Sequence, residues 1–474
     1  MTIKFGTDGW RGRIAQEFTF ENVEIVAQAT AEQFLADNPT QSEQLVFVGH
    51  DRRFLGEDFA ARVAEVMVAN GFRVKLYDTD VPTPMVSYDC HHFNARGGVI
   101  ITASHNPPEF SGFKIKLPFG GSALPVYTNQ VEARLGANPP KRVLLREALA
   151  DGRIERVPPS EAYIKRLPEI VDLEQLKAQD LEVIVDSMHG TGGHYLENFL
   201  SGGKLRVKTI RGDRDVYFGG IHPEPMMPQL QPLADEIVRR GAFVGLATDG
   251  DADRVGAVDN LGNYMNTHRL LAILTLYLVR KRKMTGGVVR TISQSVIVKR
   301  IAEKYGLPLY EVPVGFKHVA ELMLTHDILC GGEESNGLGC KLHIPERDGI
   351  FSALLCFEAM VAFGKTPSEL VADIQQEFGT FEYERIDVKV DHIEQAHRIL
   401  ALLRSDPPTS VAGFPVTEVS QLDGVKMILE DESWLLFRGS GTEPMLRVYS
   451  EATSREKLEQ LLGFGREFVR NNLK

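Results

Sequence analysis

Cysteines are few and widely separated in this chain. The four of them, at positions 90, 330, 340 and 356, include no Cys-x-x-Cys pair among 474 residues. The spacing therefore indicates neither a disulfide framework nor a paired-cysteine metal site. It favours reduced cysteines in a protein core, as is usual for cytoplasmic proteins.

Long apolar runs and basic tracts are also missing. The longest apolar stretch, Leu270 to Val279, has ten residues. A membrane span needs about 20 residues, so this stretch is typical of a buried helix. Residues 1–6 lack the apolar segment of a signal peptide. The net charge is −11 and no Lys/Arg-rich tract is present, which argues against binding to nucleic acid or to an anionic membrane surface.

What the chain does contain is typical of a globular protein with several domains. Hydrophobic residues make up 43% and charged residues 25% of the sequence, which are ordinary proportions. The length alone suggests about three domains. A weak internal repeat adds detail, because strand, helix and strand patterns span residues 45–77, 181–210 and 288–312. Each is followed by one more short apolar run, which predicts three similar α/β domains with mixed sheets.

The C-terminal part does not share this repeat. Residues 381–390 alternate between apolar and polar side chains, and residues 454–471 carry apolar side chains at helical spacing. This pattern predicts an α+β domain. Loops at the carboxyl ends of strands are where open α/β sheets bind ligands, so we expect the domains to surround a central cleft. The predicted α/β domains are residues 1–156, 157–260 and 261–378, and the predicted α+β domain is residues 379–474.

The most informative motif is Thr-Ala-Ser-His-Asn-Pro-Pro at residues 102–108. It follows the apolar run Gly98–Ile101, which predicts a strand that ends in a sharp turn. A serine at such a strand exit lies where a nucleophile or a phosphoryl carrier has to be. Taken alone, the motif could also be a turn with an incidental serine and histidine.

A second motif, Thr-Asp-Gly-Asp-Ala-Asp-Arg at residues 248–254, places three carboxylates at alternate positions after another apolar run. Carboxylates about 4 Å apart repel by roughly 4 kcal/mol per pair at an effective dielectric constant near 20, so the cluster favours a bound cation. Oxygen ligands suit Mg²⁺, Ca²⁺ or Mn²⁺. An EF-hand is excluded, because Arg254 and Asn260 replace its glycine and its glutamate. A site with few protein ligands fits Mg²⁺ that takes a further ligand from a phosphate.

Two further loops also follow apolar runs. Residues 332–337, Gly-Glu-Glu-Ser-Asn-Gly, combine acids and a hydroxyl that suit hydrogen bonding to neighbouring sugar hydroxyls. Residues 438–444, Arg-Gly-Ser-Gly-Thr-Glu-Pro, with Arg447 beyond them, offer backbone N–H groups, hydroxyls and guanidinium groups. Such groups together form a phosphate-binding loop. Each segment could also be an ordinary structural loop.

In this order, the four loops resemble those of the α-D-phosphohexomutase family. The stretch Phe-Gly-Thr-Asp-Gly-Trp-Arg-Gly at residues 5–12 matches the family as well, so the resemblance covers essentially the whole chain. It implies a phosphoglucomutase-type isomerase that interconverts hexose 1-phosphate and hexose 6-phosphate, most simply those of glucose. The implied route passes through a phosphoserine and a sugar 1,6-bisphosphate, which also serves as activator. The resemblance further implies one Mg²⁺ ion per chain, a small-molecule sugar phosphate as partner, and a cytoplasmic monomer or homodimer.

The resemblance also implies roles for individual residues. Catalytic roles are assigned to Ser104, His105, Lys114, Arg11 and Arg254. The metal ligands would be Ser104, Asp249, Asp251 and Asp253. Substrate contacts are assigned to Lys317, Glu333, Ser335, Arg438, Ser440, Gly441, Thr442 and Arg447.

Some alternatives stay open at the level of sequence. The Gly-Glu-Glu-Ser segment is similar to that of phosphoglucomutases, but Asn336 departs from the family pattern, so mannose or glucosamine phosphate remain possible substrates. A hexose-1,6-bisphosphate synthase would use the same phosphoserine. A non-catalytic phosphosugar sensor is disfavoured, because Ser104 and all three carboxylates are present. We expect Lys116 to face outward, and Arg290 could serve either the cleft or the structure.

Overall fold

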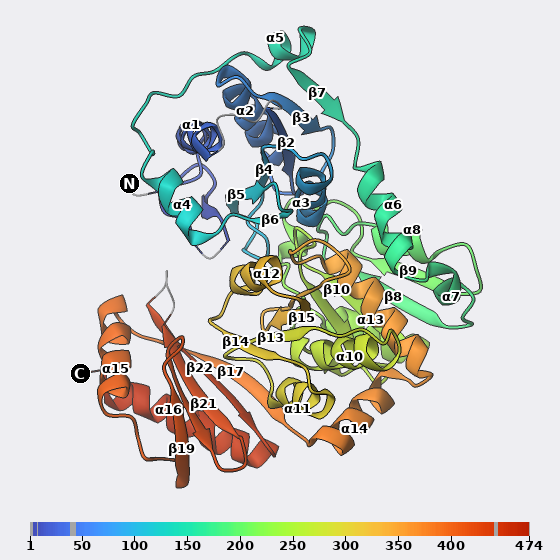
Figure 1. The fold of residues 1–474 in the computed structure, drawn as a ribbon, viewed down its shortest axis with the longest axis vertical. Coiled ribbons are helices and arrows are strands. Elements are labelled where there is room, and N and C mark those ends of the chain that lie inside the picture. Colours follow the sequence, from blue (N-terminus) through green and yellow to red (C-terminus); the bar gives the residue numbers. More distant parts are fainter. Residues whose placement is uncertain (1–2, 7, 38–43, 440–443, 474) are drawn as a thin grey trace.

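A computed structural model describes residues 3–6, 8–37, 44–439 and 444–473. Within these residues the strands form four sheets, one for each successive part of the chain (Figure 1). The first three sheets mix parallel and antiparallel pairs, and the fourth is antiparallel throughout. The predicted fold class, three α/β units followed by an α+β unit, is confirmed.

The first unit is built on a sheet with strand order β1-β5-β4-β2-β3-β7, and β6 pairs with β5. Strand β4 is buried along its whole length, as its run of apolar residues predicts for a central strand. The elements of the first unit are β1 (Trp10–Arg13), α1 (Phe20–Asp37), β2 (Leu45–His50), α2 (Gly56–Ala69), β3 (Arg73–Tyr77), α3 (Thr83–His92), β4 (Gly97–Ile101), β5 (Phe110–Leu117), β6 (Gly121–Ser122), α4 (Pro125–Glu132), α5 (Leu145–Ala150) and β7 (Ile154–Val157).

The second unit has the strand order β12-β11-β10-β8-β9, in which β8 is parallel to both β9 and β10. Its elements are α6 (Glu161–Ile170), α7 (Leu173–Lys177), β8 (Glu182–Asp186), α8 (Tyr195–Leu200), β9 (Arg206–Ile210), the short 3₁₀ helix η1 (Phe218–Gly220), α9 (Gln231–Arg240), β10 (Val244–Thr248), β11 (Val255–Val258) and β12 (Tyr264–Met265).

The third unit has the strand order β14-β13-β15-β16, in which β13 is parallel to both β14 and β15. Helix α13 of this unit packs on β10 and β11 of the second unit, so the two units share one hydrophobic core. The elements are α10 (Thr267–Arg280), β13 (Gly287–Thr291), α11 (Val296–Tyr305), β14 (Leu309–Val312), α12 (Phe316–Thr325), β15 (Ile328–Glu333), β16 (Gly337–Cys340), α13 (Gly349–Phe363) and α14 (Pro367–Phe378).

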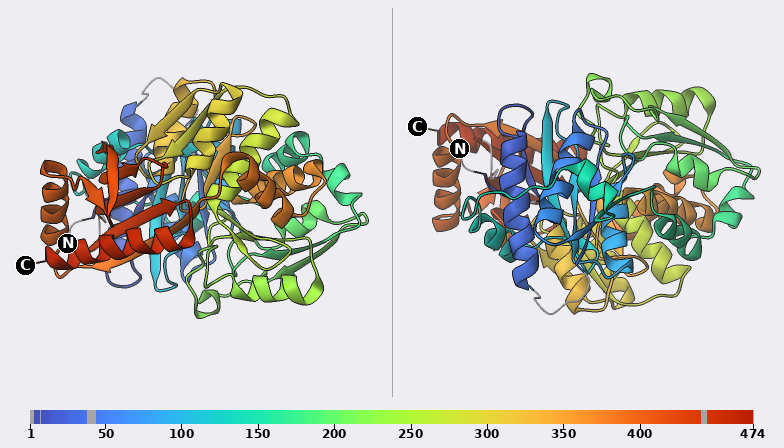
Figure 2. Two further views of the ribbon diagram at one scale, coloured as in Figure 1. Left: turned by 90° about the horizontal axis from the view of Figure 1, so that it is seen from below. Right: turned by 90° about the horizontal axis from the view of Figure 1, so that it is seen from above.

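The fourth unit is an antiparallel sheet, ordered β17-β22-β21-β20-β19-β18, with two helices. Figure 2 places this unit at one end of the molecule and the second unit at the opposite end. Its elements are β17 (Glu382–Lys389), α15 (Ile393–Ser405), β18 (Ser410–Val411), β19 (Phe414–Ser420), β20 (Val425–Leu429), β21 (Trp434–Gly439), β22 (Met445–Ala452) and α16 (Arg455–Asn471).

The first three units share one device that positions their loops. In each, a buried parallel strand is followed by an antiparallel partner, and the two are paired directly at the turn between them. The paired residues are Ile101 and Phe113, Thr248 and Val255, and Glu333 and Gly337. These turns contain the serine, acidic and Glu-Glu-Ser motifs, so each unit delivers one chemically distinctive loop at the same place in its sheet.

No single helix among the described residues is long and apolar enough to cross a membrane. One bent pair, α13 with α14, passes a test of length and composition when the two are taken together.

Lys426 joins the fourth unit to the third. Its Nζ donates to the backbone carbonyl of Ile292 at 2.6 Å and lies 4.4 Å from the ring centre of Trp434. Burial, followed by the nearby Arg290 guanidinium, lowers the pKa of Lys426 to about 8. Glu311 and Glu451 are the acids that act on it in the opposite sense. The interface therefore holds a lysine that gives up its proton more readily than lysine does in water.

This lysine predicts how stability depends on pH. An unfolded lysine titrates near pH 10.4, so between pH 8 and that value the unfolded chain binds more protons and stability rises with pH. From pH 7 to 10.5 we expect the free energy of unfolding of wild type to rise by on the order of 2 kcal/mol relative to that of Lys426→Met. Urea unfolding of both proteins across this range measures the difference. Parallel pH curves would show that Lys426 keeps an ordinary pKa.

Candidate active site

Ser104 connects the loops that follow β4 and β10. Its Oγ donates to Oδ2 of Asp249 at 2.7 Å, and the residue is almost fully buried. Its φ of 52° lies in the left-handed region, which few residues other than glycine adopt. Gly250 lies against it so closely that a Cβ there would be 2.5 Å from the Ser104 carbonyl oxygen. The two loops can therefore meet only because glycine occupies that position.

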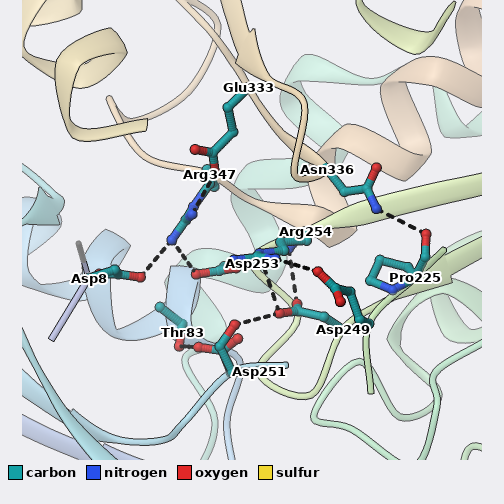
Figure 3. Close-up of polar contacts among 12 residues, drawn as sticks. Asp8, Thr83, Pro225, Asp249, Asp251, Asp253, Arg254, Glu333, Asn336 and Arg347 are labelled. Atoms are coloured by element: carbon teal, nitrogen blue, oxygen red, sulfur yellow. Dashed lines mark hydrogen bonds and ion pairs between the residues drawn. The ribbon is translucent and has the colours of Figure 1, made fainter. Parts of the chain in front are cut away.

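The three aspartates form a compact, buried cluster (Figure 3). One ligand oxygen from each of Asp249, Asp251 and Asp253 lies within 4.8 Å of the others. Lys114 Nζ donates to Oδ2 of Asp251 at 2.8 Å and to Oδ2 of Asp253 at 2.9 Å, and Thr83 Oγ1 donates to the same Asp251 oxygen at 2.6 Å. The second oxygens of Asp251 and Asp253 are buried and have no hydrogen-bond partner among the described residues.

These observations test whether the cluster fits a cation. Two buried carboxylate oxygens without hydrogen-bond partners are costly unless something positive binds them. Burial, and then the charges of Asp251 and Asp253, raise the pKa of Asp249 well above its ordinary value. Burial would also raise the pKa of Asp251, but the charge and hydrogen bond of Lys114 and the hydrogen bond of Thr83 together outweigh it, so that pKa is lowered. The neighbouring cations therefore compensate the charge of Asp249 less than that of Asp251. Because every donor is oxygen, the residues fit a hard divalent ion such as Mg²⁺.

The predicted basic groups surround this cluster. Arg11 donates to Oδ1 of Asn106, in the serine loop, at 2.5 Å. The Nε of Arg254 lies 4.0 Å from Oδ2 of Asp249 and 3.9 Å from Oδ1 of Asp253, and it is buried without a hydrogen-bond partner among the described residues. Guanidinium groups held in this way can bind a phosphoryl group from its sides.

The two predicted acid–base groups have opposite environments. Burial would lower the pKa of Lys114, but the Asp251, Asp253 and Asp8 carboxylates outweigh it and raise that pKa. Burial, followed by the charges of Arg254 and Arg11, holds the pKa of His105 well below its ordinary value. The His105 Nδ1 is buried and has no hydrogen-bond partner in the described part of the chain. The site thus pairs a protonated lysine with a neutral imidazole.

Arg347 links three units, and no sequence motif identified it in advance. Its guanidinium contacts Asp8 at 2.6 Å, Asp253 at 2.8 Å and Glu333 at 2.8 Å (Figure 3). Asp8 was also missed, although it lies inside the N-terminal motif at residues 5–12. Arg347 stands just before Asp348, the N-terminal capping residue of α13, and no spacing in the sequence marks it.

The Glu-Glu-Ser loop enters the site through Glu333. Its Oε1 accepts the Arg347 contact, and the residue is buried. Asn336 turns the other way: its side chain accepts from Thr267 Oγ1 at 2.6 Å and donates to the Pro225 carbonyl at 3.0 Å. The departure from the family pattern at Asn336 thus serves the contact between the second and third units. Ser335 is half-buried in the turn between β15 and β16.

The predicted phosphate site is described in part. Ser440, Gly441 and Thr442 lie outside the described residues. Arg438 is paired across the sheet with Arg447 and donates from Nε to Asp423 at 2.7 Å. The Nε of Arg447 is buried without a hydrogen-bond partner among the described residues. Two adjacent guanidinium groups, one with an unused buried donor, are suited to binding a phosphate.

Lys317, on α12, provides a cation from the third unit. It is half-buried, and burial lowers its pKa. The charge of Asp8 acts in the opposite sense, and the charge of Arg438 lowers the pKa of Lys317 further. Within the described residues, Arg438 forms an ion pair with Asp423 and none with the serine loop or the acidic loop.

The structure therefore joins Ser104, the three aspartates, Lys114 and Arg254 through direct contacts. Glu333 is linked to this group through Arg347. In the fourth unit, Arg438 and Arg447 are paired across neighbouring strands.

Two expectations about basic side chains are resolved. The prediction that Lys116 faces outward is wrong: it is buried, and its Nζ donates to Glu346 and Ser122 at 2.7 Å each. Residues two apart on a strand share a face, so Lys116 follows Lys114 inward. Arg290 binds Glu311 at 2.8 Å and the Ser295 carbonyl at 3.1 Å, which is a structural role.

Family models match the chain over four consecutive segments. They describe phosphoglucomutase/phosphomannomutase α/β/α domains I, II and III at residues 2–141, 161–262 and 266–378, and the C-terminal domain at residues 388–464. A protein from Thermococcus kodakarensis named phosphoglucomutase/phosphomannomutase is 30% identical over 471 residues, which is 99% of each chain.

Solved structures agree with this match. A crystal structure from Thermus thermophilus, provisionally named a phosphomannomutase, is 35% identical with a TM-score of 0.87 over 99% of each chain. N-acetylphosphoglucosamine mutase of Aspergillus fumigatus, solved with GlcNAc-6P and magnesium, is 15% identical with a TM-score of 0.63. It covers 100% of this chain and 96% of its own, and shows the fold alone. From the four matched domains and the relatives of full length, the chain belongs to the phosphoglucomutase/phosphomannomutase family, whose members are phosphohexomutases, isomerases that move a phosphoryl group within a sugar phosphate.

Proposed function

We propose that the protein interconverts hexose 1-phosphate and hexose 6-phosphate through phosphorylated Ser104 and a sugar 1,6-bisphosphate. The observation that carries this proposal is the position of Ser104. Its Oγ lies 2.7 Å from Asp249 in a cluster of carboxylates with unpartnered oxygens. Arg11 and Arg254 flank this cluster. A buried hydroxyl among oxygen ligands and guanidinium groups suits a phosphoryl carrier.

In the first half-reaction, phosphorylated Ser104 donates its phosphoryl group to a free hydroxyl of the bound sugar phosphate. The bond between phosphorus and Ser104 Oγ breaks as a bond from phosphorus to the sugar oxygen forms. The proton of the attacking hydroxyl passes to a basic group, and the Ser104 oxygen regains a proton. The proposed proton carriers are Lys114, which donates to Asp251, and His105, which directly follows Ser104 in the chain.

The second half-reaction reverses these steps with the other phosphate. The bisphosphate turns within the site, and its original phosphate is transferred to Ser104. Arg438 and Arg447 would hold whichever phosphate is not being transferred, because they are two guanidinium groups paired across neighbouring strands of a different unit from Ser104. A metal ion on Ser104, Asp249, Asp251 and Asp253 would neutralise charge on the transferring group.

Glucose phosphate is the substrate that we propose first, with mannose or glucosamine phosphate as alternatives. Glu333 and Ser335 would contact the sugar hydroxyls. The Asn336 side chain is directed toward Thr267 and Pro225, so it carries no direct selection among sugars. The Thermococcus kodakarensis relative is named for both glucose and mannose phosphates.

A positional assay tests the proposal. Purified protein is given glucose 1-phosphate and Mg²⁺, with and without added glucose 1,6-bisphosphate, and both products are followed over time. We expect glucose 6-phosphate to form catalytically, with bisphosphate acting as an activator that is not consumed. Net accumulation of bisphosphate from a second phosphoryl donor would instead indicate a bisphosphate synthase. Mannose and glucosamine phosphates are compared in the same assay.

Glu333 provides a separate prediction about sugar recognition. Glu333→Gln keeps the shape of the side chain but removes its charge, so it weakens hydrogen bonds to the sugar by about 1.5–3 kcal/mol. We expect KM for glucose 1-phosphate to rise roughly 10- to 100-fold, while a bisphosphate still phosphorylates Ser104. Steady-state kinetics and labelling of the Ser104 peptide measure the two effects. Loss of metal binding with an unchanged KM would show that the role of Glu333 is wrongly assigned.

A further inference from the structure

Arg53 lies three residues after the end of β2 and binds the serine loop through hydrogen bonds. Its side chain is fully buried, and each of its five N–H groups donates a hydrogen bond. Nε donates to Asp51 Oδ2 at 3.0 Å. The other four bonds go to backbone carbonyls. Three are in the serine loop, namely Ser104, Asn106 and Pro107 at 2.7 Å each, and the fourth is Phe110 at the start of β5, at 3.0 Å.

The same arginine also acts on the other side of Ser104 through Asp51. Asp51 Oδ2 accepts from Thr102 Oγ1 at 2.6 Å, and Thr102 Oγ1 accepts from the backbone N–H of Ser104 at 2.9 Å. The ring of Phe218, from the second unit, lies 4.9 Å from the Arg53 guanidinium carbon. The N–H and the carbonyl of Ser104 are thus both fixed by one buried network.

The hydrogen-bond network around Ser104 holds a backbone conformation that is unfavourable for serine. Ser104 has a φ of 52°, and a residue other than glycine keeps such a conformation only where its surroundings enforce it. In the proposed reaction Ser104 alternates between a neutral hydroxyl and a doubly charged phosphate ester, so the forces on its side chain change at every half-reaction. The hydrogen bonds of Arg53 all go to backbone carbonyls or to Asp51, and none of these groups changes when Ser104 is phosphorylated.

We propose that Arg53 is a positioning residue that keeps Ser104 Oγ in one place through both half-reactions. This inference rests on the proposed function and adds a residue to it. A loop that moves would let water reach the phosphoserine or would turn the phosphoryl group away from the sugar hydroxyl. A misplacement of about 1 Å costs roughly 100-fold in rate. Arg53 therefore acts on the chemical step and on the choice between sugar and water, and it does not act on sugar affinity.

The test compares Arg53→Lys and Arg53→Met with a matched control. Lysine keeps the charge but cannot reach four carbonyls at once. The control is Arg96→Met, because Arg96 is also buried, also donates to a backbone carbonyl (Phe34, at 2.6 Å), and lies at the opposite end of β4. For each protein we would measure the thermal midpoint, kcat and KM for glucose 1-phosphate. Each is also loaded with labelled phosphate from glucose 1,6-bisphosphate, and the label released to water is compared with the label passed to sugar.

We expect Arg53→Lys to lower kcat about 10- to 100-fold with KM changed less than about threefold, and to raise the share of label lost to water about tenfold. Arg96→Met should lower the thermal midpoint but keep the kcat and the label distribution of wild type. Arg53→Lys with wild-type kcat and label distribution would overturn the proposal, as would the same change in label distribution in Arg96→Met. Failure of Arg53→Lys to fold, with Arg96→Met folded, would make Arg53 a stabilising residue only. Failure of the proposed function is distinct, since wild-type Ser104 would then never carry label.

Discussion

Ser104→Ala loses phosphoryl transfer in both directions while it keeps the native fold. Alanine has no oxygen to carry the phosphoryl group, so the covalent route is closed, and we expect turnover to fall by about 10⁴-fold or more. The loop should keep its shape, because the contacts of Arg53 and Thr102 to residue 104 involve the backbone only. Isomerisation of glucose 1-phosphate measures the loss, and calorimetry measures the binding of glucose phosphate, which should remain.

A matched serine controls for the loss of a buried hydroxyl. Ser87, on α3, is fully buried, and its Oγ has no hydrogen-bond partner among the described residues. Ser87→Ala should therefore keep activity close to that of wild type. If Ser104→Ala retained more than a few per cent of turnover, a carrier other than Ser104 would have to be sought.

Asp251→Asn should lower turnover nearly as much as Ser104→Ala does, because it disrupts the proposed metal site. The change removes the charge behind the unpartnered Oδ1 oxygen and weakens the contact with Lys114. We expect kcat to fall by about 10³-fold, because the transferring group loses the neutralisation that a hard cation supplies in phosphoryl transfer. Excess chelator should have a comparable effect on wild type, reversed by Mg²⁺. Direct titration with Mg²⁺ by calorimetry should show weakened binding in the variant.

Asp259→Asn is the control for this variant. Asp259 is also buried and lies in the same unit, but it accepts hydrogen bonds from the backbone of Leu261 and Asn263 and is not part of the cluster. It should keep activity and Mg²⁺ binding. Full turnover of wild type in excess chelator would show that the aspartate cluster does not hold a catalytic metal.

The sequence was sufficient to predict the individual loops of the site, because each loop directly follows a buried strand. The apolar runs before Ser104, Asp249 and Glu333 each predicted a buried strand, and the structure places all three motifs at strand exits. The alternation of carboxylates at residues 249–253 was enough to predict a cluster of carboxylates that could hold a cation, because residues this close in sequence stay close in space. Local pattern therefore sufficed for the loops themselves.

The contacts between loops could not be predicted in this way. Arg347 binds Asp8, Asp253 and Glu333, which come from three different units. Nothing in the spacing of these residues encodes their meeting, because it depends on how whole sheets are placed against one another. Arg53 was missed for a related reason. Its partners are backbone carbonyls, which leave no trace in residue types.

The direction in which a side chain points was a second feature that the sequence did not predict. Lys116 was expected to face solvent, yet it is buried, and its charge is compensated by Glu346, which is 230 residues away. Asn336 stands in the Glu-Glu-Ser loop, in a left-handed conformation with a φ of 71°. Its side chain binds Thr267 and the Pro225 carbonyl. In both cases a distant partner decides the role of a residue whose neighbours in sequence suggest another.

The role of Ser104 as phosphoryl carrier has one direct test. Purified wild-type protein is mixed with glucose 1,6-bisphosphate labelled in its phosphates, and the peptide that contains Ser104 is isolated and sequenced by mass spectrometry. We expect one labelled phosphoryl group on Ser104, which leaves the protein when unlabelled glucose 6-phosphate is added and appears in the sugar phosphate. Isomerisation that proceeds while Ser104 never carries label would contradict this role.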